Sequence, residues 1–273
     1  MKYVLPGFKR GLTVTLLWLC SMIVLPLALL FISAYQLNAE EIWQIVTGER
    51  VITSLLLSFK MAFVATLINL IFGLLLAWIL VRYDFTGKKI VDAFIDLPFA
   101  LPTAVAGIAL ASLYAPNGLL GGLLAQFGIQ LAYTPSGIAV ALVFVSLPFI
   151  VRAVQPVLAQ LDPGFEEAAY ILGASKLTVF RRVILPLLLP ALIGGAGMGF
   201  ARALGEYGSV IFIAGNVPLV SEIAPLIIMS KLDLYDVKGA SVVALLMLII
   251  SFTLIFFINL LQWAINKRIS QVK

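Results

Sequence analysis

Long apolar runs alternate with short polar segments along the whole chain of 273 residues. A helix that crosses the hydrocarbon core of a bilayer needs about 20 consecutive, mostly apolar residues. The pattern therefore predicts an all-α, polytopic membrane protein in which six transmembrane helices form one domain over residues 1–273. The six predicted spans are 12–34, 55–81, 93–114, 137–157, 191–214 and 242–265.

The first apolar run has two interpretations, because it follows the basic residues Lys2, Lys9 and Arg10. A basic start before an apolar stretch is also typical of a secretory signal peptide. The run is long for the apolar region of such a signal, however, and no small-residue cleavage site closes it cleanly. We therefore interpret it as the first transmembrane helix.

Composition agrees with a membrane protein. Hydrophobic residues make up 62% of the chain and charged residues 11%, and the mean hydropathy is +1.12. A soluble domain has roughly 25% charged residues. The chain has no histidine and one cysteine, Cys20, so the sequence predicts neither a disulfide within the chain nor a metal site.

Basic residues are distributed unevenly between the segments that join the spans. Because cytoplasmic loops collect Lys and Arg, this asymmetry predicts that the N- and C-termini are cytoplasmic. It also accounts for the basic isoelectric point without a nucleic-acid partner. The outer segments hold only Arg50, Lys231 and Lys238. The inner segments hold Lys2, Lys9, Arg10, Arg82, Lys88, Lys89, Arg152, Lys176, Arg181, Arg182, Lys267, Arg268 and Lys273.

The chain carries no recognisable catalytic constellation. It lacks a phosphate-binding loop, a nucleophile elbow and any Cys–His pair, and Gly87-Lys88-Lys89 lacks the upstream glycine and the hydroxyl residue of such a loop. We expect no catalytic residue, which argues against a membrane enzyme. A pumped substrate then needs energy from a partner or from an ion gradient.

The longest cytoplasmic segment holds a predicted helix–turn–helix over 162–182. Asp162 is a natural N-cap, Pro163 suits the first helical position, and Glu166 and Glu167 suit the positive end of the helix dipole. Gly173 is a typical residue for the end of the helix. A second short helix then leads into the fifth span.

The residues of this loop resemble the EAA loop of importer-type ABC permeases, with one conservative departure, Val183 for the usual isoleucine. In that family the loop is a coupling helix that docks on an ATPase subunit. The resemblance implies that Glu167 is a polar anchor, that Ala168 and Ala169 form a close-contact surface, and that Gly173 makes the turn. The alternative is a capped loop helix with no partner. The matching residues are Glu167, Ala168, Ala169, Gly173, Val183, Leu185 and Pro186, and we add Glu166 to the predicted coupling set.

Three further stretches, 96–107, 200–208 and 221–225, resemble oxyanion permeases, most closely those of sulfate/thiosulfate importers. Molybdate and tungstate permeases are their neighbours and remain an alternative. The resemblance implies a MetI-like permease fold in the inner (cytoplasmic) membrane, working by alternating access. It also implies a pseudo-twofold heterodimer with a second permease, two cytoplasmic ABC ATPases that use ATP and Mg, and a periplasmic binding protein. This chain itself would hold no cofactor.

Few polar groups lie inside the predicted spans. Arg202 is expected near the middle of the fifth span, where a charge costs several kcal/mol unless it is paired or hydrated. Glu206 lies one turn later and Ser209 close to the same face, so the three either tune or gate an anion path or lock the helix to a neighbour.

Lys60, near the outer end of the second span, either attracts a dianion or extends to the interface. A gradient-driven anion transporter that uses Arg202 and Glu206 as its ion site remains the rival class.

Small residues and prolines predict local packing. Gly195, Gly199 and Ala203 recur every four residues, as in close helix crossings. Pro98 and Pro102 are expected to kink the third span. Asp92 and Asp96, near its inner end, are expected to be offset by the nearby Lys88 and Lys89.

Overall fold

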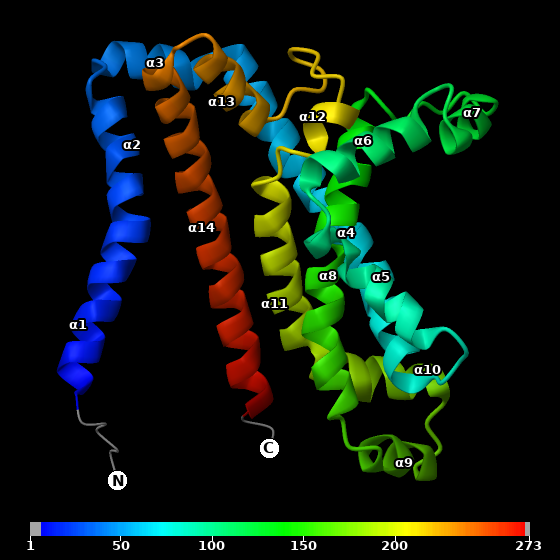
Figure 1. Cartoon of the computed structure of the whole chain (residues 1–273). Coiled ribbons are helices and arrows are strands. Elements are labelled where there is room, and N and C mark those ends of the chain that lie inside the picture. Colours follow the sequence, from blue (N-terminus) through cyan, green and yellow to red (C-terminus); the bar gives the residue numbers. More distant parts are fainter. Residues whose placement is uncertain (1–6, 271–273) are drawn as a thin grey trace.

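The computed structural model describes residues 7–270, and every regular element in that part of the chain is a helix (Figure 1). Lys2 and Lys273, two of the basic residues used to predict the topology, lie outside the described residues. Six helical segments are long and apolar enough to cross a membrane, so the predicted all-α fold with six candidate spans is confirmed. These segments are Phe8–Tyr35, Glu49–Arg82, Thr103–Ala125, Pro135–Ala159, Lys176–Leu204 and Val237–Ala264.

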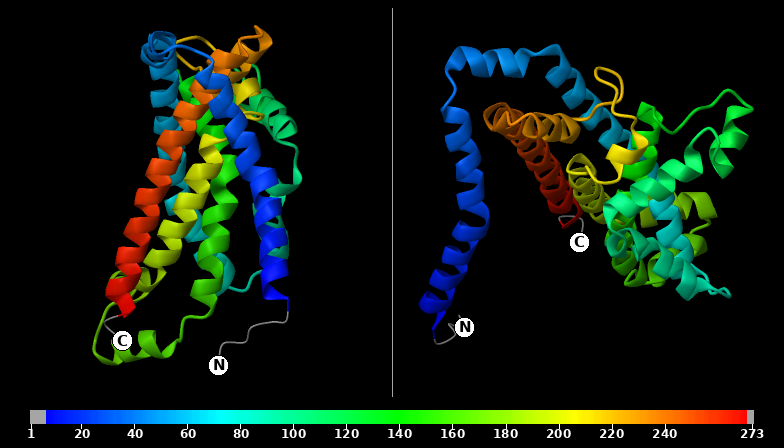
Figure 2. Two further views of the ribbon diagram at one scale, coloured as in Figure 1. Left: turned by 90° about the vertical axis from the view of Figure 1, so that its left-hand side faces the viewer. Right: turned by 45° about the horizontal axis from the view of Figure 1, so that its top comes forward.

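The N-terminal half of the first candidate span stands apart from the other helices (Figure 2), whereas its C-terminal half packs against the last helix of the chain. It consists of α1 (Phe8–Leu19), the π-helical turn η1 (Cys20–Val24) and α2 (Leu25–Tyr35). The wider π turn precedes Pro26, which has no N–H to give to a normal helical turn. No residue of α1 or η1 is buried within the chain. This part of the span therefore offers its apolar surface to lipid or to another subunit.

At the end of the molecule that the topology prediction places outside, a short helix leads into the second span. In α3 (Ala39–Thr47), the Asn38 side chain accepts from the Glu41 N–H while the Glu41 carboxylate accepts from the Asn38 N–H, a complete capping box. The next helix, α4 (Glu49–Arg82), has 34 residues and no proline. It therefore runs unbroken through the predicted span 55–81 and beyond both of its ends.

The third predicted span, 93–114, is not one helix. It is divided into α5 (Lys88–Ala100) and α6 (Thr103–Tyr114), with Leu101 extended at φ −84° and ψ 134° between them. Pro102 causes the break, because a proline disfavours helical geometry in the residue before it. Pro98, predicted to kink the span as well, stays inside α5.

Two more helices follow on the outer and central parts of the bundle. The short α7 (Leu119–Ala125) extends sideways at the upper end of Figure 1. The central helix α8 (Pro135–Ala159) packs along both α4 and α11. It includes the predicted fourth span, 137–157, and keeps Pro148 and Pro156 within its length.

The loop predicted to be cytoplasmic forms α9 (Gly164–Ile171) and α10 (Lys176–Val179), which continues through the π turn η2 (Phe180–Ile184) into α11 (Leu185–Leu204). The predicted fifth span, 191–214, is wrong at its C-terminal end, because the helix stops at Leu204. Arg202 therefore lies in the last turn of α11 and not in the middle of a continuous span. The apolar sequence goes on, but Gly208 packs so closely against Thr103 that an added Cβ would collide with the Thr103 Oγ1.

The last part of the chain returns to the outer end and then crosses once more. The short α12 (Val210–Ile213) and α13 (Ala224–Asp233) lie at the upper end in Figure 1, and α14 (Val237–Ser270) descends from there. The apolar stretch 223–229, which is too short to cross a membrane, belongs largely to α13. It packs against α4 and α14 through Ala224 and Ile227.

Small residues hold the centre of the bundle together. An added Cβ at Gly195 would lie 2.9 Å from the Ala153 Cβ of α8, and one at Gly199 would lie 3.4 Å from the Ser146 carbonyl oxygen. The glycine stripe of α11 therefore faces α8 and allows the two backbones to approach closely. Two clusters of buried side chains, one in each half of the bundle, lie around this crossing.

Candidate functional site

The helix α9 is defined by local capping at both ends. The Asp162 Oδ1 accepts from the Gly164 N–H at 2.9 Å, and the helix begins at Gly164, one residue later than an Asp162 cap predicts. At the other end Gly173 has φ +81°, the left-handed conformation that glycine adopts without strain. The Gly173 N–H bonds to the Tyr170 carbonyl and the Ala174 N–H to the Ala169 carbonyl, which is the Schellman pattern.

This short helix has an inner and an outer face. Ala169 and Glu166 turn towards the bundle and are partly buried, whereas Glu167 and Ala168 are exposed. Figure 1 shows α9 as the lowest element, lying across the direction of α8. Its outer surface also carries large apolar side chains, and Ile171 and Leu172 are 86% and 87% exposed. Together with the half-exposed Phe165 and Tyr170, they form an apolar surface that we call the α9 outer face.

Glu166 joins α9 to the inner end of α4. Its carboxylate forms an ion pair with the Arg82 guanidinium in the last turn of α4. Arg82 also lies over the Trp78 ring, with its Cζ 5.4 Å from the ring centroid, and Trp78 meets Phe180 of η2 edge to face at 5.6 Å. The predicted coupling loop is thus attached to α4 twice, by the ion pair between Glu166 and Arg82 and by the aromatic contact between Phe180 and Trp78.

The other residues of the predicted coupling set lie behind α9. Leu185 is half-buried and packs against the inner cluster of buried side chains, together with Val183. Pro186 is exposed near the start of α11, where its missing N–H is tolerated because the first helical N–H groups have no partner within the helix. These two residues therefore shape the entry to the fifth span and do not belong to the α9 outer face.

The structure brings Arg202, Glu206 and Ser209 together. The Glu206 side chain is almost fully buried, and its Oε2 pairs with Arg202 Nη1 at 2.6 Å. Its Oε1 accepts from the Ser209 N–H at 2.8 Å and from the Ser209 Oγ at 2.9 Å. Both carboxylate oxygens are satisfied, so this buried charge is fully paired. Because Arg202 lies in the last turn of α11 and Glu206 and Ser209 follow it, these bonds hold the segment 205–209 against the end of α11. We call this contact the Arg202–Glu206 clasp.

Lys60 does not join this group. It lies on an exposed position of α4, about 11 residues from the outer end of that helix, which is roughly 16 Å at 1.5 Å per residue. Within the described residues it makes no hydrogen bond or ion pair. Its charge is therefore directed away from this chain.

Asp92 and Asp96 are paired differently from the prediction. Arg152 of α8 binds both, through Nη1 to Asp92 Oδ1 at 2.6 Å and through Nε and Nη2 to the two oxygens of Asp96 at 2.8 and 2.5 Å. Lys88 instead pairs with Asp84. The hydrogen bond from Arg152 holds the pKa of Asp92 below its ordinary value. Sequence distance favoured the lysines, but only the guanidinium reaches both carboxylates from a facing helix.

A further ion pair, between Arg50 and Glu222, was not predicted from the sequence. Arg50, in the first turn of α4, donates from Nε and Nη2 to the two oxygens of Glu222 at 2.7 and 2.6 Å. Glu222 is only 2% exposed. A cation in the first turn of a helix opposes the helix dipole, and that unfavourable position was the available signal that Arg50 has an acidic partner.

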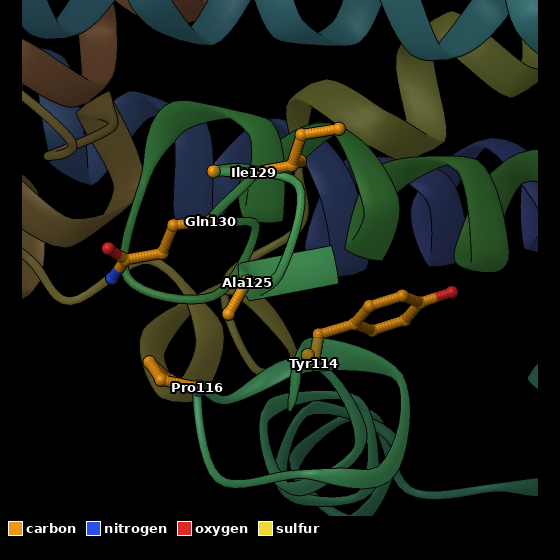
Figure 3. A pocket seen from close by; sticks show the side chains of 7 residues that line it. Tyr114, Pro116, Ala125, Ile129 and Gln130 are labelled. Carbon is orange, nitrogen blue, oxygen red and sulfur yellow. The ribbon is translucent and has the colours of Figure 1, made fainter. Parts of the chain in front are cut away.

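Two cavities of the described chain lack a charged lining, whereas a third, of about 280 Å³ at the start of α4, is lined by Arg50, Lys231 and Asp236 among others. The first, of about 210 Å³ near the outer end, is lined by Tyr114, Pro116, Ala125, Ile129 and Gln130 (Figure 3) and by glycines, with no charged side chain. A groove of about 700 Å³ between α4, α11 and α14 has apolar walls apart from Thr66. Neither of these two offers the positive charge that would hold a dianion.

Comparison with known families places the chain among transport proteins. Residues 69–271 match the family described as "Binding-protein-dependent transport system inner membrane component". The match covers α4 from its middle onwards and all the elements that follow, including the coupling loop and the Arg202–Glu206 pair.

Curated relatives are similar almost from end to end. The chain is 49% identical to the sulfate transport system permease protein CysT of Salmonella typhimurium, over 97% of this chain and 96% of the relative. It is 47% identical to the CysT protein of Escherichia coli K12, with the same coverage. The CysT protein of Synechocystis is 48% identical over 91% of this chain and 87% of the relative.

Solved structures share the fold at low sequence identity. A bacterial ABC transporter involved in the import of the acidic polysaccharide alginate aligns with a TM-score of 0.77 and 14% identity over 94% of each chain. The MetNI methionine ABC transporter, in inward-facing conformations, aligns with a TM-score of 0.60 and 20% identity over 84% of this chain and 99% of the other. The predicted importer-type permease fold is confirmed.

Proposed function

Since the chain belongs to the family of binding-protein-dependent transport system inner membrane components, as an ABC importer permease of the CysT type, we propose that it forms half of a pore through which sulfate enters the cell. The assignment of sulfate as the substrate rests on the nearly end-to-end identity of 47–49% to two sulfate permeases. We propose thiosulfate as a second substrate of the same pore.

The energy for transport comes from a partner that binds the α9 outer face. Leu172 and Ile171 expose nearly their whole side chains on a helix that lies clear of the bundle. An apolar surface of this kind favours a protein partner. Beside it Glu167 supplies a charge, and Ala168 allows a close approach. We assign this face to a cytoplasmic ABC ATPase, one copy on each of two permeases, and the ATP and Mg belong to that ATPase.

A second permease subunit completes the pore. Asp96 keeps 48% of its side chain exposed and Arg152 keeps 30%, although both lie at the inner part of the bundle. Arg202 keeps 32%. Charged groups are costly against lipid tails, so these faces meet water or protein. The proposal therefore places a related permease, arranged by a pseudo-twofold axis, against this side of the chain.

Selectivity comes from outside the pore. The charge of Arg202 is balanced by Glu206, and neither the cavity beside Tyr114 nor the groove between α4, α11 and α14 has a positive lining. A pore that held sulfate tightly would also release it slowly. A periplasmic binding protein therefore selects the anion, and the permease passes it on by alternating access when the ATPases close and open. The chain lies in the inner membrane with both termini in the cytoplasm.

Uptake of labelled sulfate tests the substrate. A cell that lacks its own sulfate permease, and that supplies the other subunits, should regain sulfate uptake when this chain is expressed. Unlabelled thiosulfate should compete, whereas molybdate at the same concentration should not. Rescue of molybdate uptake without sulfate uptake would assign the chain to the neighbouring permease group.

Purification of the complex tests the partner. Glu167→Arg places a cation beside the α9 outer face and should release the ATPase, and Gly173→Asp should do so by adding a negative charge at the C-terminal end of α9, where it opposes the helix dipole. Lys238→Met is a matched control at the exposed outer start of α14, and it should keep both assembly and uptake. Unchanged co-purification and uptake in both α9 variants would contradict the coupling role.

A further inference from the structure

The helix α4 carries an arginine at each of its two ends, and each arginine is bound to a glutamate of a different segment. Arg82 in the last turn pairs with Glu166 of α9, and Arg50 in the first turn pairs with Glu222 of the outer loop. The 34 residues between the ends of α4 span about 50 Å at 1.5 Å per residue. One helix thus connects the coupling loop with the outer surface of the molecule.

The outer attachment is built from two contacts on the same face of α4. Arg50 holds both oxygens of the buried Glu222, and the Ser58 Oγ, eight residues on, accepts from the Ala224 N–H at 2.8 Å. Ser221 beside them is fully buried. The segment 221–224 therefore follows α4, and it ends the outer loop that begins at the Arg202–Glu206 clasp.

The inner attachment is equally specific. Arg82 lies between the Trp78 ring of its own helix and the Glu166 carboxylate of α9. Both partners of this ion pair are largely buried, with side-chain exposures of 24% and 18%. A movement of α9 is thus transferred to the inner end of α4 through a confined contact and not through a flexible surface pair.

The body between the two ends is suited to transmit movement. Sharp kinks in helices occur mostly at proline, and α4 has none, whereas α5, α8 and α11 each contain at least one. The buried Asn69 donates to the Val143 carbonyl and to the Ser146 Oγ, which fixes α4 to α8 near its middle. The two helices therefore move together.

We infer that α4 is a strut that links the coupling helix to the outer loop, and that Arg82 and Arg50 are the positioning residues at its two joints. This inference rests on the proposed function, because it states how the ATPase and the outer binding protein influence each other. Closure of the ATPases displaces α9, and α4 carries the displacement to segment 221–224. By linkage, docking of the binding protein on the outer side acts on the ATPase through the same strut.

The test uses the complete transporter in proteoliposomes with its binding protein and sulfate. The readout is the ratio of ATP hydrolysis with and without the loaded binding protein. Arg82→Met and Arg50→Met should each lower this ratio by roughly fivefold or more, within the usual range of allosteric coupling. Co-purification of the ATPase and its basal hydrolysis should remain at the wild-type level. Lys88→Met at the inner end and Lys238→Met at the outer end are matched controls and should keep the ratio.

The double variant distinguishes a strut from two separate structural contacts. If both joints belong to one path, Arg82→Met/Arg50→Met should lower the ratio no further than the worse single variant. Losses that multiply in the double variant would overturn the inference. So would single variants that behave like the controls, or a ratio that stays constant while basal hydrolysis and yield fall.

A charge exchange keeps the test decisive if Arg82→Met does not assemble. Arg82→Glu/Glu166→Arg rebuilds the inner pair and should recover the ratio to within about twofold of wild type. Assembly without recovery, or failure of both variants to assemble, assigns Arg82 a structural role only. A wild-type complex that neither imports sulfate nor contains an ATPase would instead refute the proposed function, and the strut variants are compared only with a working wild type.

Discussion

At the scale of single residues, the molecule pairs the charges that it buries. Glu206 and Glu222 are 1% and 2% exposed, and each is bound by an arginine. The Arg202–Glu206 pair was predictable because its partners are four residues apart. The Arg50–Glu222 pair was not, because its partners lie 172 residues apart and only the folded chain brings them together.

Removal of Arg202 tests what the buried pair contributes. Arg202→Met should destabilise the chain by about 3 kcal/mol, because it leaves Glu206 charged and buried without its countercharge. Arg202→Met/Glu206→Leu should recover most of that loss. The thermal unfolding midpoint of the purified chain measures both effects.

Transport by the same double variant then separates a gate from a structural clasp. Wild-type sulfate uptake would leave the pair only its structural role. Lost uptake in a stably folded double variant would assign it to the translocation path.

The turn at Gly173 gives a second prediction. Its φ of +81° disfavours side chains other than glycine, although no atom lies within 4 Å of an added Cβ. Gly173→Val should therefore disturb the end of α9 by about 1–2 kcal/mol, the cost of a left-handed conformation, and should weaken ATPase co-purification. Gly173→Asn tolerates this conformation and should retain the ATPase, and equal retention by both variants would show that the turn does not matter.

At the scale of elements, the apolar pattern predicted which stretches cross the membrane better than it predicted where helices stop. Runs 55–81 and 137–157 lie inside the single helices α4 and α8, because an unbroken apolar stretch is itself the physical requirement for a span. Runs 93–114 and 191–214 are interrupted at Leu101 and Gly205. The second interruption depends on contacts between α6 and the segment after α11, which hydropathy does not encode.

The contact between these two elements is tested at Gly107. An added Cβ there would lie 2.5 Å from the Ser209 carbonyl oxygen, which is backbone and cannot rotate away. Gly107→Ala should destabilise the fold by about 1–3 kcal/mol, as overpacking does, despite the better helix propensity of alanine. Gly122→Ala is the matched control, since its added Cβ has only an ordinary contact at 3.5 Å. Equal unfolding midpoints for the two variants would contradict the close packing.

At the scale of the whole molecule, the sequence predicted the all-α architecture and the helix–turn–helix of the loop over 162–182 because their signals are local. Apolar runs, caps and the glycine turn each lie within a few residues of what they specify. The inner face of α9 was not predictable in the same way. Glu166 and Glu167 look equivalent in the sequence, and only the fold separates them by turning Glu166 to Arg82 and leaving Glu167 exposed.

The same scale supports the proposal that one chain is half of a pore. The first span has no buried residue in α1 or η1, and the charged side chains of Arg152 and Asp96 remain partly exposed. We propose that another subunit covers these surfaces. In that proposal, α9 at one end of the molecule and the loop after α11 at the other are the two contact regions of a transporter driven by a separate ATPase.

Cysteine labelling at the α9 outer face tests the central claim most directly. With Cys20 replaced by serine, Ile171→Cys provides a single thiol on a side chain that is 86% exposed. A membrane-impermeant maleimide should label it only from the cytoplasmic side, and the assembled ATPase should protect it. Labelling from the outside, or equal labelling with and without the ATPase, would contradict the account.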